Sequence, residues 1–273
     1  MTIQEVIELI HAKCDMDLSV FSTSFLTRTL EIRIKETASC DLDEYIEVII
    51  SNPGEAILLN NALHINYSLF FRNSGDMSLL EGFVMPDLLQ HKAKQKSKAL
   101  RIWSVGCAEG HEAYSLAMLA DRVMHERECK LQMMIFGTDI LADRLAKARL
   151  GTYDRSSLQN VKLSYIDSYF ISRKLLYTVI DPIRGQVDFS IGDIVDPAFA
   201  SPPAGLFASF DLVCCCNMMI YYNRSIQFRI LEKLYRSLDR NGYLLVDESE
   251  RLIVEKFGKF RLISPYGNIF LKK

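Results

Sequence analysis

The N-terminal part of the chain places hydrophobic residues at helical spacing. Isoleucine and valine recur every three or four positions, so residues 2–13 are predicted to form a helix. The same spacing predicts a second helix over residues 23–35, and a third that starts near Asp41 and ends before the Asn-Pro-Gly segment that follows residue 51. Together these segments predict a small all-helical domain over residues 1–62.

From residue 99 onward, short apolar segments alternate with amphipathic ones. The apolar segments predict strands over residues 99–105, 131–139, 186–193, 210–217 and 242–249. The amphipathic segments predict helices over residues 110–127, 142–149 and 225–238. This alternation is typical of an α/β fold with a doubly wound, mostly parallel sheet. Two last segments, 260–264 and 267–273, predict an antiparallel pair at the edge.

Two regions lie outside this alternation. Residues 171–189 contain the short β-like segments LLYTVI and DPIRG, which predict a small β insertion. Residues 63–98 are predicted to be a linker helix that joins the helical domain to the sheet, so that the second domain covers residues 63–273. The lysines at 92, 94, 96 and 98 are interpreted as a solvated linker.

Composition excludes several classes of protein. Hydrophobic residues make up 49% of the chain and charged residues 24%, which suits a sizeable core and excludes a disordered chain or a coiled-coil rod. No apolar run approaches the roughly 20 residues that a membrane span needs, and Glu5 and Glu8 interrupt what a secretion signal would keep apolar. We therefore expect a soluble, cytoplasmic protein. The net charge of -2 does not favour nucleic acid as a partner.

The cysteines predict neither disulfides nor a metal site. There are 7 of them, an odd number, and three are consecutive at 214–216. No Cys-x-x-Cys pair is present, so zinc is not expected. We interpret them as free thiols in a reducing compartment.

A loop with Gly106 and Gly110 follows the first predicted strand. Small residues let the backbone turn tightly and approach a ligand, although a purely structural turn is an equal alternative. Asp139 ends the next strand, where a carboxylate can accept hydrogen bonds from both ribose hydroxyls of NAD or S-adenosylmethionine. The loop lacks the middle glycine of a dinucleotide fingerprint, and Glu112 would repel a pyrophosphate but attract an ammonium or a sulfonium. Glu112 also suits a helix N-terminus for electrostatic reasons alone.

Two further segments carry polar and aromatic residues. Asn217 and Tyr221 follow the fourth strand, where an amide and a phenol can orient a substrate, while Met218 and Met219 suit packing. The segment 66–73 contains two phenylalanines followed by an arginine, which fits packing and function equally well.

Taken together, five motifs resemble the CheR-type chemotaxis receptor methyltransferases, which methylate receptor glutamates with S-adenosylmethionine. The resemblance covers nearly the whole chain. It comprises Asn66, Ser68 and Phe70-Phe71-Arg72; Trp103-Ser104 with Gly110, Glu112 and Tyr114-Ser115; Thr138-Asp139-Ile140 with Leu145, Lys147-Ala148-Arg149, Gly151 and Tyr153; Asn217–Tyr222; and Ser249-Glu250.

The resemblance implies a protein-glutamate O-methyltransferase of bacterial origin, with S-adenosylmethionine as cofactor and S-adenosylhomocysteine as product. It implies the cytoplasmic helical region of a chemoreceptor as the partner, and a monomer is expected by default. The implied cofactor contacts are Asn66, Ser68 and Arg72 on the joining helix, Gly106 in the glycine loop, Glu112 at the ammonium, Asp139 at the ribose, Asp193 and Ile194 at the adenine, and Cys216 and Asn217 at the methionine moiety. Tyr221 matches the tyrosine that orients the reacting carboxylate.

Several positions depart from the family pattern. Ser68 replaces a threonine, Asn73 replaces an acid, and Cys216 replaces an arginine that holds the substrate carboxylate. The helix that corresponds to the receptor-facing one carries only Arg28, Arg33 and Lys35 as basic residues. Two alternatives therefore stay open, namely a methyltransferase for another signalling partner and a non-catalytic protein that binds S-adenosylmethionine in regulation or scaffolding. The insertion at 171–189 resembles a β-subdomain that grips a receptor tail in some members.

Overall fold

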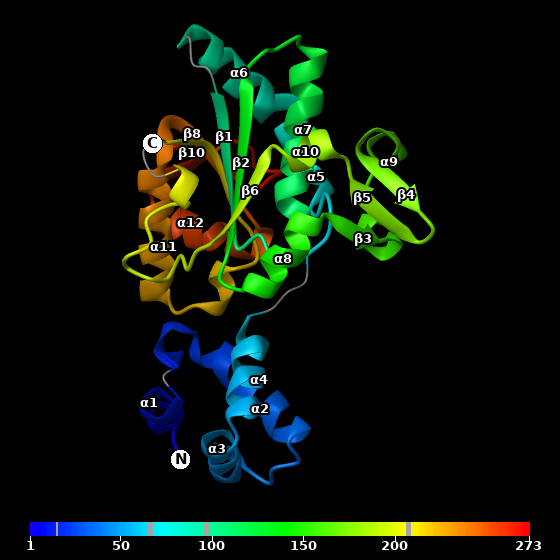
Figure 1. Ribbon diagram of the computed structural model, residues 1–273. Helices are drawn as coiled ribbons and strands as arrows, with labels where there is room; N and C mark the ends of the chain where they lie inside the picture. The colour runs from blue at the N-terminus through cyan, green and yellow to red at the C-terminus, as the bar shows by residue number, and fades with distance from the viewer. Residues whose placement is uncertain (15, 65–67, 96–98, 206–208) are drawn as a thin grey trace. The chain divides into compact units, whose positions relative to one another are not determined.

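The computed structural model describes residues 1–14, 16–64, 68–95, 99–205 and 209–273. The chain divides into two compact units (Figure 1). The helical unit comprises Met1–Tyr67 and Ile220–Gln227, and the sheet unit comprises Ser68–Met219 and Phe228–Lys273. The assignment of 220–227 to the helical unit was not expected from the sequence, because that segment follows a strand of the sheet.

The helical unit contains the three predicted helices and a fourth. Its elements are α1 (Ile3–Cys14), the 3-10 turn η1 (Leu18–Val20), α2 (Thr23–Glu36), α3 (Leu42–Ser51) and α4 (Pro53–Leu63). Asn52 explains the additional helix, since its side chain accepts a hydrogen bond from the Gly54 amide and Pro53 occupies the first helical position. The Asn-Pro-Gly segment therefore ends one helix and begins the next.

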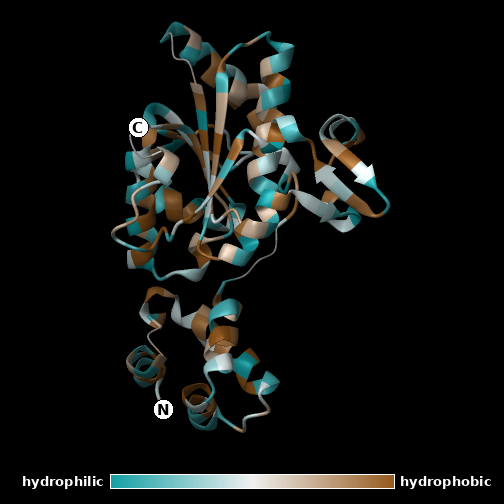
Figure 2. Ribbon diagram, in the orientation of Figure 1, coloured by the Kyte–Doolittle hydropathy of each residue, from teal (hydrophilic) through white to brown (hydrophobic). Residues whose placement is uncertain are grey.

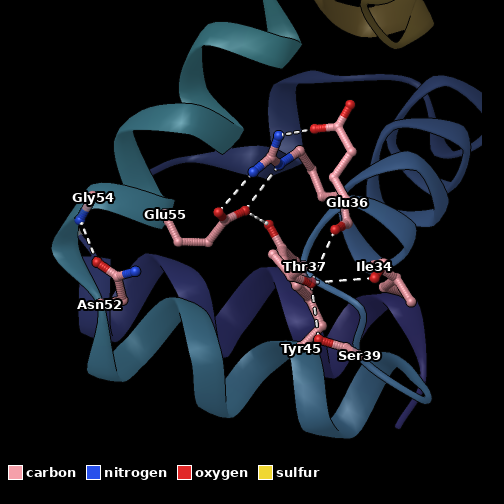
Figure 3. Close-up of polar contacts among 9 residues, drawn as sticks. Ile34, Glu36, Thr37, Ser39, Tyr45, Asn52, Gly54 and Glu55 are labelled. Carbon is pink, nitrogen blue, oxygen red and sulfur yellow. Dashed lines mark hydrogen bonds and ion pairs between the residues drawn. The ribbon is translucent and has the colours of Figure 1, made fainter.

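A buried ion pair crosses the core of this unit (Figure 3). Glu55 is 3% exposed and accepts hydrogen bonds from Arg33 Nε at 2.9 Å, Arg33 Nη2 at 2.7 Å and the Tyr45 hydroxyl at 2.8 Å. Burial alone would raise the pKa of Glu55, but the bonds from Arg33 and Tyr45 outweigh it and hold the pKa below its usual value. The expectation that Arg33 points outward to a receptor is wrong, because this carboxylate pairs with it inside the core.

The main sheet has the strand order β6-β2-β1-β7-β8-β10-β9. Its strands are β1 (Ala99–Val105), β2 (Gln132–Asp139), β6 (Val187–Ile191), β7 (Phe210–Cys215), β8 (Leu238–Val246), β9 (Phe260–Leu262) and β10 (Ile269–Lys272). The first five are parallel, and β10 is antiparallel to both of its neighbours. All the predicted strands are present, although β10 lies inside the sheet and only β9 of the last pair is at the edge.

Helices cover both faces of the sheet, as the alternation predicts. Figure 1 shows α7 (His111–Glu126) on one side and α11 (Arg224–Ser237) and α12 (Arg251–Phe257) on the other. The short α8 (Ala142–Leu150) follows β2. Hydrophobic colours run along the central strands in Figure 2, and the largest buried side chain there is Trp103. Among the described residues, no helix is both long and apolar enough to cross a membrane.

The predicted linker helix begins later than expected. It consists of α5 (Ser74–Leu79), the π-helical turn η2 (Leu80–Val84) and α6 (Met85–Lys94). Asn73 precedes it with φ 59°, a left-handed conformation that interrupts a helix. Ser68 and Arg72 therefore lie in the segment before the helix, and Asn66 lies outside the described residues.

Lys92 does not belong to a solvated linker. It is buried in α6 and forms an ion pair with Asp211 of β7 at 2.6 Å. The charge pairing anchors α6 to the sheet, which no local pattern in the sequence could reveal.

The β insertion starts earlier than predicted. It is a three-stranded antiparallel sheet in the order β3-β5-β4, made of β3 (Thr152–Asp154), β4 (Phe170–Arg173) and β5 (Leu176–Val179). The 3-10 turn η3 (Arg155–Leu158) and α9 (Leu163–Tyr169) connect β3 to β4. The DPIRG segment is helical, α10 (Asp181–Arg184), because Pro182 suits the first turn of a helix. Residues 187–191 belong to the main sheet, which is a second correction to the predicted boundary.

Candidate functional site

The carboxyl ends of four parallel strands bring most of the predicted site residues to one edge of the sheet. The chain runs from β1 outward to β2 and β6, then returns to the other side of β1 for β7 and β8. Such a reversal opens a crevice between the loops after β1 and β7, which is where α/β sheets bind ligands. The loops at this edge carry Gly106, Asp139, Asp193 and Cys216.

The glycine loop after β1 needs its glycines. Gly106 has φ +66° and Gly110 has φ +88°, both in the region that side chains rarely adopt. A Cβ at Gly106 would lie 3.1 Å from the sulfur of Met218 in the loop after β7. The two loops therefore approach each other closely, and a larger residue at Gly106 would separate them.

Asp139 connects the loops after β1 and β2. One carboxylate oxygen accepts a hydrogen bond from the Ala108 amide at 2.9 Å, and the other accepts one from the Leu141 amide at 3.0 Å. The side chain is 9% exposed. Because each carboxylate oxygen can accept two hydrogen bonds, each oxygen of Asp139 can accept one more, which suits the two hydroxyls of a ribose.

Glu112 lies in the first turn of α7 and is only partly exposed. Its carboxylate accepts a hydrogen bond from Ser104 Oγ at 2.7 Å, and the nearby Cys216 thiol and Arg72 also favour its charged form. Burial raises the pKa of Glu112 more than these three partners lower it. A bound ammonium group would supply the missing countercharge, so the residues fit the amino-acid end of S-adenosylmethionine and disfavour a diphosphate.

Cys216 does not replace the charge of the family's arginine. Burial and the nearby Glu112 raise the pKa of its thiol well above the usual value, so that the side chain is neutral. A neutral thiol cannot form the paired, charge-assisted hydrogen bonds that a guanidinium forms with a carboxylate.

Glu250 holds the loop after β7, a role that the sequence did not reveal. The side chain is fully buried, and its oxygens accept hydrogen bonds from the amides of Asn217 at 2.9 Å, Met218 at 2.7 Å and Met219 at 2.6 Å. The amide of Asp247 donates a fourth bond at 3.1 Å. Burial raises the pKa of Glu250 to about 7 in spite of these four donors. The only sequence signal was the matched Ser-Glu pair.

Other motif residues hold the framework of the site. Their hydrogen bonds are Trp103 Nε1 to Thr138 Oγ1 at 2.9 Å, the Tyr114 hydroxyl to the Ala148 carbonyl at 2.8 Å, the Phe71 amide to Ser115 Oγ at 2.9 Å and the Tyr153 hydroxyl to the Glu109 carbonyl at 2.6 Å. These bonds fix the first two strands, α7, α8 and the Phe-Phe-Arg segment relative to one another.

The remaining predicted residues differ in their surroundings. Asp193 accepts a hydrogen bond from the Val195 amide at 2.8 Å in the loop after β6, and the adjacent Ile194 is buried. Tyr221 belongs to the helical unit, where its carbonyl accepts a hydrogen bond from the Ser22 amide and its ring lies 4.7 Å from that of Phe25.

The cysteines and the acidic residues form no metal centre in the part of the chain that is described. The 7 cysteines that the sequence contains are free thiols. No group of three or more His, Cys, Asp or Glu side chains that could hold a metal ion occurs among the described residues.

Comparison with known families decides the classification. Residues 66–266 match the family described as CheR methyltransferase, SAM binding domain. The chain belongs to the CheR methyltransferase family. The predicted CheR resemblance, the α/β methyltransferase fold and S-adenosylmethionine as the cofactor are thereby confirmed. The assignment of individual contacts stays a prediction.

Relatives of this CheR chain are bacterial. A probable biofilm formation methyltransferase, WspC of Pseudomonas aeruginosa, is 27% identical over 96% of this chain, which spans 60% of that protein. A chemotaxis protein methyltransferase of Borreliella burgdorferi is 25% identical over 92% of this chain and 88% of its own length. Chemotaxis protein methyltransferase 1 of Pseudomonas aeruginosa is 30% identical over 70% of this chain and 68% of its own length.

Proposed function

We propose that the protein transfers a methyl group from S-adenosylmethionine to glutamate side chains of a chemoreceptor. The observation that carries the proposal is Glu112, a buried carboxylate with a raised pKa beside the crevice at the sheet edge. A cationic amino-acid group would stabilise it, while Asp139 at the next strand suits a ribose. The names of the chemotaxis relatives support a chemoreceptor as the substrate. A cytoplasmic location and the helical region of the receptor are part of the same proposal.

The residues of the crevice would bind and orient the two reactants. When bound, S-adenosylmethionine supplies a methyl group on a sulfonium, which a carboxylate can displace in one step. Glu112 and Arg72 would hold its amino-acid end and Asp139 its ribose. The loops with Gly106, Asp193-Ile194 and Cys216-Asn217, together with Ser68, would surround the rest, while the expected contact of Asn66 stays a prediction from the family pattern.

The chemistry requires little acid or base assistance. A glutamate carboxylate has a pKa of about 4.3, so it is already ionised at neutral pH. The main contribution of the protein would be positioning, which can supply about 7–11 kcal/mol of the barrier. Tyr221, four positions after Asn217 in the chain, would orient the acceptor carboxylate. Because Cys216 is a neutral thiol, the acceptor would be held less firmly than by a guanidinium, at a cost of about 1.5–3 kcal/mol.

Methyl transfer to a receptor fragment tests this function. The purified protein is incubated with radiolabelled S-adenosylmethionine and the cytoplasmic helical region of a chemoreceptor, and the product is treated with base. A glutamate methyl ester releases volatile, radioactive methanol, whereas label that stays on the protein after base treatment would contradict glutamate O-methylation. A receptor fragment with its glutamates replaced by alanine is the control.

A receptor outside chemotaxis is a second candidate substrate. The biofilm relative WspC aligns with 96% of this chain, so the same chemistry would suit a receptor in biofilm formation. The two candidates are separated by offering both kinds of receptor fragment to the same preparation. Tight binding of S-adenosylhomocysteine without turnover on either fragment would instead favour a non-catalytic role.

A further inference from the structure

Asp247 joins two loops that border the crevice. It follows β8 directly, and its Oδ2 accepts a hydrogen bond from the side-chain amide of Asn73 at 2.8 Å. The side chain of Asn217 also favours the charged form of this carboxylate. Asn73 follows Arg72, and Asn217 follows Cys216, so each amide comes from a segment that carries an expected cofactor contact.

Both asparagines adopt an unusual backbone conformation. Asn73 has φ 59° and Asn217 has φ 58°, in the left-handed region that asparagine tolerates better than most residues. This conformation turns the chain sharply at each position. The two strained turns converge on one carboxylate from positions that are far apart in the sequence.

The same carboxylate also caps a short helix. Its Oδ1 accepts hydrogen bonds from the Ser249 amide at 3.1 Å and from Ser249 Oγ at 2.9 Å, at the start of the 3-10 turn η6 (Glu248–Glu250). Burial alone would raise the pKa of Asp247, but the bonds from Asn73, Ser249 and Asn217 outweigh it and keep the pKa below its usual value. Asp247 is therefore a charged acceptor that receives hydrogen bonds from Asn73 and Ser249 and that Asn217 helps to keep charged.

We propose that Asp247 is a positioning residue that holds the Arg72 segment and the Cys216–Asn217 loop in the arrangement that binds S-adenosylmethionine. This inference rests on the proposed use of the crevice for that ligand. Asp247 itself acts through Asn73 and Asn217, so its removal affects cofactor affinity without removing a cofactor contact.

The chain provides a matched control for the capping role. Asp17 caps the 3-10 turn η1 in the helical unit and accepts hydrogen bonds from the Ser19 amide at 2.9 Å and from Ser19 Oγ at 2.5 Å. Asp17→Asn and Asp247→Asn therefore disturb the same kind of cap. Of these two caps, Asp247 also accepts a hydrogen bond from the Asn73 side chain and interacts with that of Asn217.

Calorimetric titration with S-adenosylhomocysteine tests the proposal on the intact chain. Asp247→Asn is expected to weaken binding about tenfold, because an amide group then faces amide donors. The KM for S-adenosylmethionine is expected to rise more than kcat falls. Asp17→Asn is expected to leave the affinity unchanged. Equal affinities in wild type and Asp247→Asn would overturn the proposal.

An exchange of acid and amide separates positioning from mere stability. Asn73→Asp places two carboxylates against each other and is expected to weaken binding about tenfold. The double variant Asn73→Asp/Asp247→Asn restores one carboxylate and one amide, so it is expected to recover most of that affinity. If the double variant loses as much binding free energy for S-adenosylhomocysteine as the two single variants lose together, the proposal is contradicted.

Two further outcomes are distinguishable. If Asp247→Asn does not fold, the Asn73→Asp variant alone still decides the question, because Asn73 is not part of the cap and an unchanged affinity in this variant would overturn the proposal. If wild-type protein does not bind S-adenosylhomocysteine at all, the proposed function fails. If wild type binds and no variant differs from it, only the role of Asp247 fails.

Discussion

Two buried carboxylates, one in each unit, differ in what surrounds them. Glu55 in the helical unit is bonded to Arg33 through two hydrogen bonds and to the Tyr45 hydroxyl, and its pKa lies below the usual value (Figure 3). Glu112 in the sheet unit accepts a hydrogen bond from the Ser104 hydroxyl, and burial raises its pKa despite the influence of Cys216 and Arg72. The Arg33 guanidinium neutralises Glu55 within the fold. The positive charge near Glu112 does not offset the cost of burying its carboxylate.

This difference separates a structural site from a binding site. A buried acid that its own neighbours neutralise contributes to one specific packing arrangement. A buried acid that stays under-compensated costs stability in the free protein and recovers that cost when a cation binds. Replacing each carboxylate in turn tests whether Glu55 serves stability and Glu112 serves ligand binding.

Replacement of the structural carboxylate should have the largest effect. Glu55→Gln removes the buried charge partner of the Arg33 guanidinium and leaves it only the exposed Glu36, and we expect a loss of about 3–5 kcal/mol in the free energy of unfolding. Denaturation followed by circular dichroism measures it. Glu36→Gln is the matched control, since Glu36 also pairs with Arg33 but its side chain is 57% exposed, and its loss should be below about 1 kcal/mol. Equal losses in both variants would show that burial does not matter here.

The sheet unit should lose stability in mild acid because of a buried histidine. His111 is 3% exposed, has no hydrogen-bond partner on either ring nitrogen among the described residues, and its burial lowers its pKa to about 4. The unfolded chain binds this proton near pH 6.5, so stability falls by about 3 kcal/mol as the pH drops from 6.5 to 4. His111→Phe should remove that part of the pH dependence. If the free energy of unfolding of His111→Phe falls between pH 6.5 and 4 as steeply as that of the wild type, His111 is not the cause of the acid sensitivity.

Removal of the charge at Glu112 should weaken ligand binding and spare the fold. Glu112→Gln keeps an acceptor for Ser104 but cannot pair with an ammonium, so we expect the Kd for S-adenosylhomocysteine to rise about 100-fold, or about 2.7 kcal/mol. The free energy of unfolding should stay equal or increase, because a charged group no longer has to be buried. Glu55→Gln is the control with the opposite pattern. It should lower the free energy of unfolding and leave the affinity of the folded protein for S-adenosylhomocysteine unchanged.

The smallest effect should come from the hydroxyl that supports Glu112. Ser104→Ala removes one hydrogen bond of 2.7 Å from the carboxylate, and we expect a loss of binding of about 1 kcal/mol, or roughly fivefold. Titration with S-adenosylhomocysteine at several pH values measures it. Because the pKa of Glu112 should rise further in this variant, the loss should be greater at acidic than at alkaline pH.

The sequence alone predicted the parallel sheet and the positions of Asp139 and Glu112. Those features follow from local periodicity and from residues directly at strand ends. It did not reveal Lys92–Asp211, Glu250 with its loop amides, or Asp247 with Asn73. Each of these depends on partners that are distant along the chain, so no local pattern marks them. The sequence did not indicate the helix at 181–184 for another reason, since it has only 4 residues and a single buried one, Ile183, which is too little for a helical period to show.

The most direct test of the central claim compares two ligands on one protein. S-adenosylhomocysteine and methylthioadenosine share the nucleoside and the sulfur, but only the first carries the amino-acid ammonium and carboxylate. We predict that calorimetry shows a strong preference of the wild type for S-adenosylhomocysteine, and that Glu112→Gln loses most of that preference while its affinity for methylthioadenosine stays the same. Equal affinity of the wild type for both ligands would contradict the claim that Glu112 receives the cationic end of the cofactor.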